Sequence, residues 1–301
     1  METDAKTIND LFVKKLDTQE GMDKLAMEGG AFVRDKLRES SFARKVLPPD
    51  YVSQADLQVS VQHDGVVKIV EIEPESKAMV VNFRGKPTTN YIEAERVELP
   101  FHSISSEDFE KTEEELLAYR MPLTKVIEQN SVLDIQKIED ETFLRHIDNA
   151  IVESGNAVPI NYNSTTGQIP EDGFRQLFDK IDEKELRSQK LLMDTTTFNR
   201  IVVNNNTNDT FGDGGIKGEI AVNGYKYPTL YGRQIIISTK TDLLKDKIYA
   251  FTDPEYLGQF CILNDTKFNI DKDRNLICFS AYETIGMVIA NTKSAARMDL
   301  S

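Results

Sequence analysis

The residue types that carry out chemistry are few in this sequence, and their spacing does not bring them together. The three histidines, His63, His102 and His146, are scattered, and no spacing joins them to a cysteine as a metal site requires. The motifs of a serine-nucleophile elbow, a phosphate-binding loop and a dinucleotide-binding loop do not occur. His146 is best interpreted as a helix-face residue. The sequence therefore predicts no catalytic and no cofactor-binding residue.

One acidic segment resembles the start of a calcium-binding loop. Asn269, Asp271 and Asp273 have the alternate spacing of such a loop. However, Arg274 stands where the loop needs glycine, and Ser280 stands where it needs a bidentate glutamate. Asn and Asp also favour turns. A turn between two strands is the better interpretation, and no metal ion is predicted here.

Two other acidic stretches are also interpreted without a metal ion. The segment 209–215 is rich in Gly and Asp and reads as a flexible loop rather than a cation site. Glu113, Glu114 and Glu115 are consecutive, and consecutive helical residues point in different directions. They are therefore expected to form a solvated helix face.

Composition and charge limit the classes of function. The net charge of −14 and the absence of Trp argue against a surface that grips nucleic acid, because phosphate binding needs clustered Lys and Arg. There is no secretory signal and no apolar run of membrane-spanning length. Cys261 and Cys278 lie in apolar runs and are expected to be buried free thiols in a reducing compartment. We expect a soluble intracellular protein.

The N-terminal third predicts two short helices and then a hairpin. Apolar spacing indicates amphipathic helices around residues 11–16 and 25–37, the second broken by the Gly29-Gly30 pair. Such helices are expected to form an arm that packs on something else and ends at Pro48-Pro49. Strand patterns follow at 59–72, 79–83 and 92–99, with turn residues between them. A hairpin of this kind needs a neighbour to dock on.

The remainder predicts a long helix followed by mixed helices and strands. Ser105 or Ser106 is expected to cap a helix through residues 107–120. Pro122 then opens a long helix to Ile151, with Ile127, Ile135, Ile138, Leu144, Ile147 and Ile151 at helical spacing. Strands are expected at 190–193, 233–238, 247–251, 260–263, 268–270 and 276–290, helices at 174–181 and after Asp194, and a loop at 204–224. The fold class is α+β.

The order of these segments resembles the major capsid proteins of tailed phages, which have the Hong Kong 97-type fold. The local sequence is similar too, in VRDKLRESSFARKVLPP, in YIEAERVELPFHSISSEDFEKTEEELLAY, and in YAFTDPEYLGQFCIL followed by SAYETIGMVIAN. The resemblance covers nearly the whole chain. It implies an N-terminal arm at 1–50, an extended E-loop hairpin with flanks at 51–100, a P domain with a spine helix at 101–157, an A domain at 158–254, and completion of the P domain at 255–301.

The resemblance also implies contacts between subunits. The E-loop would lie across the neighbouring subunit, where Lys77, Arg84 and Lys86 are candidates to meet acidic residues such as Glu113 and Glu114. Some members of the family crosslink an E-loop lysine to a P-domain asparagine. Lys77 or Lys86 with Asn291 would be the corresponding pair, although nothing in the sequence identifies it.

The expected function is that of a non-enzymatic major capsid protein. It would self-assemble into hexamers and pentamers of an icosahedral shell that encloses double-stranded DNA, with assembly in the host cytoplasm and a final location in the virion. Expected partners are copies of itself, a separate scaffolding protein, a portal and a decoration protein, but no membrane. An encapsulin-type compartment subunit is one alternative. A soluble α/β enzyme or ligand-binding protein and a tail-tube or baseplate protein are the others.

Overall fold

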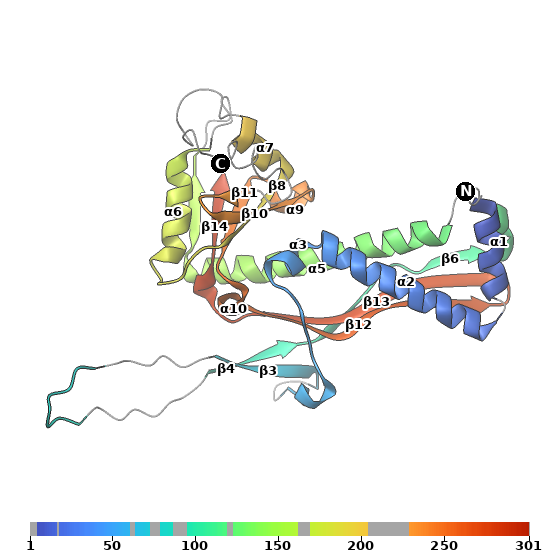
Figure 1. The fold of residues 1–301 in the computed structure, drawn as a ribbon, viewed down its shortest axis with the longest axis horizontal. Coiled ribbons are helices and arrows are strands. Elements are labelled where there is room, and N and C mark those ends of the chain that lie inside the picture. Colours follow the sequence, from blue (N-terminus) through green and yellow to red (C-terminus); the bar gives the residue numbers. More distant parts are fainter. Residues whose placement is uncertain are drawn as a thin grey trace.

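The computed structural model describes residues 5–16, 18–60, 64–72, 79–86, 95–118, 123–161, 169–203 and 229–300. Figure 1 shows an elongated body built along the helix α5 and the strands β12 and β13. A second body with α6 and α7 stands at one end of α5, and a hairpin of β3 and β4 extends below. The predicted loop at 204–224 lies outside the described residues.

The N-terminal helices pack on the rest of their own chain. They are α1 (Ala5–Leu16), α2 (Gln19–Ser40) and α3 (Phe42–Val46). The helix α1 contacts α4 (Glu113–Ala118), and α2 contacts β12 and α5. Ser41 caps α3 by accepting a hydrogen bond from the Arg44 amide. The Leu47-Pro48-Pro49 segment then leads to the short strand β1 (Asp50–Tyr51) and the 3₁₀ turn η1 (Gln54–Asp56).

The prediction that Gly29-Gly30 breaks the second helix is wrong, because α2 runs through both glycines. A Cβ atom on Gly29 would lie 2.8 Å from the Phe268 ring, and one on Gly30 would lie 3.3 Å from the Thr266 carbonyl oxygen. The glycines therefore allow the backbone of α2 to lie directly on β12, which is the close approach that glycine permits.

The elongated body is a five-stranded sheet in the described residues, covered by the long helix α5 (Leu123–Ser154). Its centre is the antiparallel pair β12 (Gly258–Asp273) and β13 (Leu276–Ile289). The strand β1 pairs with β12, while β5 (His102–Ser105) and β6 (Phe109–Thr112) both pair with β13. The long predicted helix is confirmed, and its 32 residues span about 48 Å.

The second body is a six-stranded sheet in the described residues. Its order is β7 (Ala157–Ile160), β14 (Ala295–Leu300), β11 (Lys247–Phe251), β8 (Lys190–Asp194), β10 (Arg233–Ser238) and β9 (Thr229–Leu230). The helices are α6 (Glu171–Asp182), α7 (Thr195–Val203), α9 (Thr241–Leu244) and α10 (Pro254–Leu257), with the 3₁₀ turn η3 (Thr292–Ser294). The predicted strands at 190–193, 233–238 and 247–251 are confirmed, and Asp194 caps α7 as expected.

The hairpin is a small sheet of β2 (Gln58–Val59), β3 (Val66–Ile72) and β4 (Glu95–Pro100). Its third predicted strand, at 79–83, is wrong, because these residues form no ladder and turn at Asn82–Gly85. Figure 1 shows the described segment 79–86 well away from every labelled element.

Three further predictions need correction. Residues 109–112 are the strand β6, so the helix predicted from 107 begins only at Glu113, where the Thr112 hydroxyl accepts from the Glu115 amide. The predicted strands at 260–263 and 268–270 are one strand with irregularities between Ile262 and Lys267. The predicted turn at 269–273 belongs to this strand, and the chain turns at Arg274 and Asn275.

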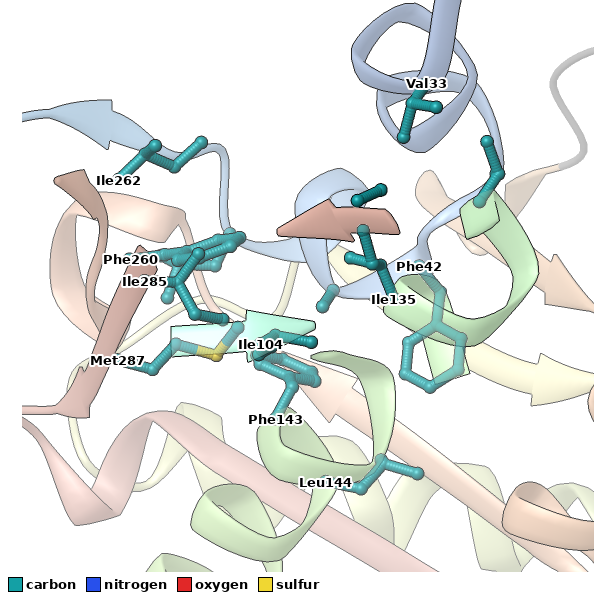
Figure 2. Packing of buried hydrophobic residues seen from close by; sticks show 14 of the residues in the cluster. Val33, Phe42, Ile104, Ile135, Phe143, Leu144, Phe260, Ile262, Ile285 and Met287 are labelled. Carbon is teal, nitrogen blue, oxygen red and sulfur yellow. The ribbon is translucent and has the colours of Figure 1, made fainter. Parts of the chain in front are cut away.

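The main apolar core lies where α3, α5 and the β12–β13 pair meet. Figure 2 shows Phe42, Ile135, Phe143, Phe260 and Met287 gathered from these elements. A second core holds the six-stranded sheet against α6 and α7. Ile138 was predicted to belong to the buried stripe of α5, but it is exposed, whereas Glu139 and Asp140 beside it are buried.

We expect Gly29→Val to destabilise the protein by roughly 1–3 kcal/mol, because the new side chain meets the Phe268 ring. The matched control is Glu28→Val, since Glu28 is the exposed neighbour on the same helix. Chemical denaturation measures both. Equal stability of the two variants would contradict the account of why the glycine pair is there.

Candidate functional site

The structure does not bring the predicted contact residues together within one chain. Lys77 lies outside the described residues. Arg84 and Lys86 are exposed on the segment 79–86. Glu114 is exposed on α4, whereas Glu113 accepts a hydrogen bond from Lys272 Nζ at 2.9 Å and so already has a partner in its own chain. The helix α4 packs on α1, at the opposite end of the molecule from segment 79–86 (Figure 1).

The segment 79–86 presents an apolar surface to solvent, which we call the apolar tip and define as Met79, Val80, Val81 and Phe83. Val80 and Phe83 are fully exposed, at 104% and 112% of their reference areas. Burying one large apolar side chain is worth about 1.5–3 kcal/mol. In one chain this gain is not realised, so the tip is a surface suited to a partner.

The other residues singled out from the sequence are the histidines, the two cysteines and Asn291. His63 lies outside the described residues, and no group of three His, Cys, Asp or Glu that could hold a metal ion occurs among the described ones. Burial and then the charge of Arg145 lower the pKa of both His102 and His146. Cys261 is buried and Cys278 half-buried, and both are free thiols as predicted. The Asn291 side chain accepts a hydrogen bond from the Lys293 amide.

The most strongly organised polar group of the described chain is a buried ion cluster around Arg44. The Arg44 Nε lies 3.0 Å from Glu139 Oε1, and the Arg44 Nη2 lies 2.8 Å from Glu283 Oε1. All three side chains have almost no exposed surface. Thr266 donates a further hydrogen bond to Glu283 Oε2 at 3.1 Å. The cluster therefore joins α3, α5, β13 and β12 at one point.

A second pair extends the cluster toward the six-stranded sheet. The Lys240 Nζ donates to Asp140 Oδ2 at 2.7 Å, and the Ala43 amide donates to Asp140 Oδ1 at 3.0 Å. The Ser41 Oγ lies 2.9 Å from both Glu139 Oε1 and Asp140 Oδ1. Asp140 therefore connects α3 to α5 and to the segment before α9. We define the ion cluster as Ser41, Arg44, Glu139, Asp140, Lys240 and Glu283.

Burial dominates the electrostatics of this cluster. It raises the pKa of Glu139 to about 7, against the lowering influence of Arg44, while Glu283 and Asp140 raise it further. Burial also raises the pKa of Glu283, and Arg44 opposes it. Burial alone would lower the pKa of Arg44, but the two carboxylates outweigh it, so the pKa is raised and the guanidinium stays charged.

Sequence reasoning missed this cluster, and one signal was available. The adjacent residues Glu139 and Asp140 lie on α5 between apolar residues that point into the core, where charged side chains are rare unless they are paired. Arg44 lies 95 residues from Glu139 and 239 residues from Glu283 along the chain, so a local sequence pattern could not identify these partners.

The comparisons with known proteins give the fold and no sequence family. No protein-family model matches the chain, and no curated protein matches it. A capsid structure of Cyanophage P-SCSP1u is similar with a TM-score of 0.60 at 12% identity, covering 85% of this chain and 86% of that one. The mature capsid of bacteriophage PhiM1 is similar with a TM-score of 0.59 at 9% identity, covering 87% of each chain.

A virus-like particle also has a similar fold. The virus-like particle from Pyrococcus furiosus is similar with a TM-score of 0.53 at 12% identity, covering 92% of this chain and 99% of that one. The chain therefore has the fold of tailed-phage capsid proteins, as its sequence predicted, on a mixed helix and sheet architecture.

We expect Arg44→Ala to destabilise the protein by about 3–5 kcal/mol, because it leaves Glu139 and Glu283 buried without their cation. The control is Arg96→Ala, which removes an ion pair with Glu71 whose side chains are both exposed and should cost under about 1 kcal/mol. Thermal and urea unfolding measure both. A loss of similar size in the two variants would contradict the structural role of the ion cluster.

Proposed function

We propose that this chain is the subunit of a capsid shell that assembles from many copies of itself. The fold supports this, since the similar structures include phage capsids. The observation that carries the proposal is the apolar tip, which stands apart from the described body (Figure 1) with Val80 and Phe83 fully exposed. A surface of this kind gains stability only when another molecule covers it.

A second copy is the partner that the tip suits best. The tip and α4 lie at opposite ends of one chain, so the cations of segment 79–86 can meet the acidic α4 only in a neighbouring copy (Figure 1). Arg84 and Lys86 would then face Glu114, with Glu113 and Lys77 as further candidates. Each such exposed pair contributes under about 1 kcal/mol, so apolar burial supplies most of the affinity.

The elements suggest the roles of the segments within a shell. Residues 1–50 would be the N-terminal arm and 51–100 the E-loop hairpin with its flanks. Residues 101–157 would begin the P domain with α5 as its spine, residues 158–254 would form the A domain, and residues 255–301 would complete the P domain. The strands β5 and β6 belong to residues 101–157, and β13 belongs to residues 255–301. Their pairing supports a P domain that is built from both ranges.

The proposed shell is that of a tailed phage and would enclose double-stranded DNA without reading its sequence. The net charge of −14 supports enclosure over tight binding, because an acidic wall repels phosphate. Hexamers and pentamers would build an icosahedral virion shell in the host cytoplasm. A scaffolding protein, a portal and a decoration protein are the proposed partners, and the subunit itself would be non-catalytic. In the described chain, no helix is both long and apolar enough to cross a membrane.

An encapsulin-type compartment is the second candidate. The likeness to the virus-like particle from Pyrococcus furiosus favours it, since nearly the whole of both chains is covered. The two candidates share the fold and differ in content. Nuclease-protected DNA inside purified particles supports the phage shell, and a co-purifying protein cargo without DNA supports the compartment.

We expect Val80→Ser with Phe83→Ser to weaken assembly by at least tenfold in the concentration required, because both side chains are exposed in one chain and buried only in a shell. The free energy of unfolding of the isolated subunit should be the same in the double variant as in the wild-type protein. Val152→Ser is the control, as Val152 is 72% exposed on α5. Light scattering and electron microscopy give the readout, and unimpaired assembly of the double variant would refute the role of the tip.

A further inference from the structure

The charges of the ion cluster do not balance when all its groups are ionised. Arg44 and Lys240 supply two cations, and Glu139, Asp140 and Glu283 supply three carboxylates. The side chains of the carboxylates have no exposed surface. A buried excess charge is costly, and such a site takes up a proton when it can. The cluster therefore lacks one positive charge.

The geometry around Ser41 indicates where a proton binds and supplies the missing positive charge. Its hydroxyl has a single proton, yet Ser41 Oγ lies 2.9 Å from Glu139 Oε1 and 2.9 Å from Asp140 Oδ1. The hydroxyl can donate to only one of these oxygens. The other contact is favourable only if the carboxyl group itself donates, which requires a proton on that carboxyl.

We propose that the ion cluster binds one proton between Glu139 and Ser41, and that loss of this proton loosens the attachment of residues 41–47. In the protonated state Glu139 donates to Ser41, Ser41 donates to Asp140, and the cluster is neutral. In the deprotonated state two carboxylates compete for one hydroxyl proton, and the excess negative charge is buried beneath α3. The segment between α2 and β1 is therefore a latch controlled by acidity.

The neighbouring charged groups do not remove the imbalance. From β12, Asp265 acts on Glu283 as a further negative charge. The Lys190 Nζ of β8 contacts the carbonyl oxygens of Lys45 and Val46 at 2.8 and 2.9 Å, and the charge of Asp253 acts on it. Lys190 thus holds the far end of α3 by its carbonyl groups and does not contact the cluster carboxylates among the described hydrogen bonds.

The direction of the pH effect follows from Glu139. Burial raises its pKa from 4.5 to about 7, so between these values the folded state binds a proton that the unfolded state has released. The stabilising contribution is fully present below about 4.5 and is lost as the pH rises through about 7. The latch is closed in mild acid and loosens above neutrality. This inference concerns a single chain and does not depend on the proposed shell.

Hydrogen exchange of the full chain tests this proposal. Protection factors for the 41–47 amides, corrected for intrinsic exchange, should fall by up to about tenfold between about pH 6 and 8.5 in the wild-type protein, while those of α6 stay constant. Glu139→Gln removes both the excess charge and the competition for the Ser41 proton, so the folded variant should show constant protection. Glu283→Gln removes only the excess charge, so the fall in protection should become smaller in that variant. Glu153→Gln, a substitution of an exposed residue of α5, should keep the wild-type fall.

Three results of these exchange measurements would contradict the proposal. Constant protection of residues 41–47 in the wild-type protein would overturn the proposal even if neither variant folds. If the protection factors of residues 41–47 fell as much in the Glu139→Gln variant as in the wild-type protein, the assignment of the proton to Glu139 would be overturned. A parallel fall in α6 would show general destabilisation instead of a local latch and would also count against it.

Discussion

The structure depends on the burial of Arg44 between Glu139 and Glu283. Partners 95 and 239 residues away bring α3, α5 and β13 to one point. Two rings of the apolar core lie beside the cluster, with Arg44 over Phe260 and Lys240 over Phe42. Figure 2 shows both rings within that core. An apolar core alone tolerates sliding of α3 along α5, whereas charges in fixed hydrogen-bonded positions do not. The cluster therefore fixes where the N-terminal helices end and where the chain departs toward the hairpin.

The N-terminal helices and the apolar tip differ in how their apolar residues are covered. The N-terminal helices bury their apolar residues within the same molecule, because the two glycines of α2 let this helix pack closely on β12. The apolar tip has Val80 and Phe83 fully exposed in the single chain. The described part of one chain is thus a well-packed body from which the apolar tip projects uncovered. In the proposed shell, the subunit would gain this remaining burial on assembly.

Much of the fold could be predicted from sequence, because its signals are local. The helical period of α5 and the apolar runs of β8, β10 and β11 are signals from residues close together in sequence. The Gly29-Gly30 pair was misread because only the distant Phe268 explains it. The ion cluster and the exposure of Ile138 also arise from long-range packing. The β-propensity of residues 79–83 predicted a strand, but the structure has no strand there.

The most direct test of the account is an electron cryo-microscopy reconstruction of the particles formed by the purified protein. We predict a closed shell in which Val80 and Phe83 of each copy lie buried against a neighbouring copy. A shell in which the apolar tip stays exposed to solvent would contradict the central role given to it. A protein that remains monomeric at every concentration, alone and with candidate scaffolding partners, would contradict the proposed shell itself.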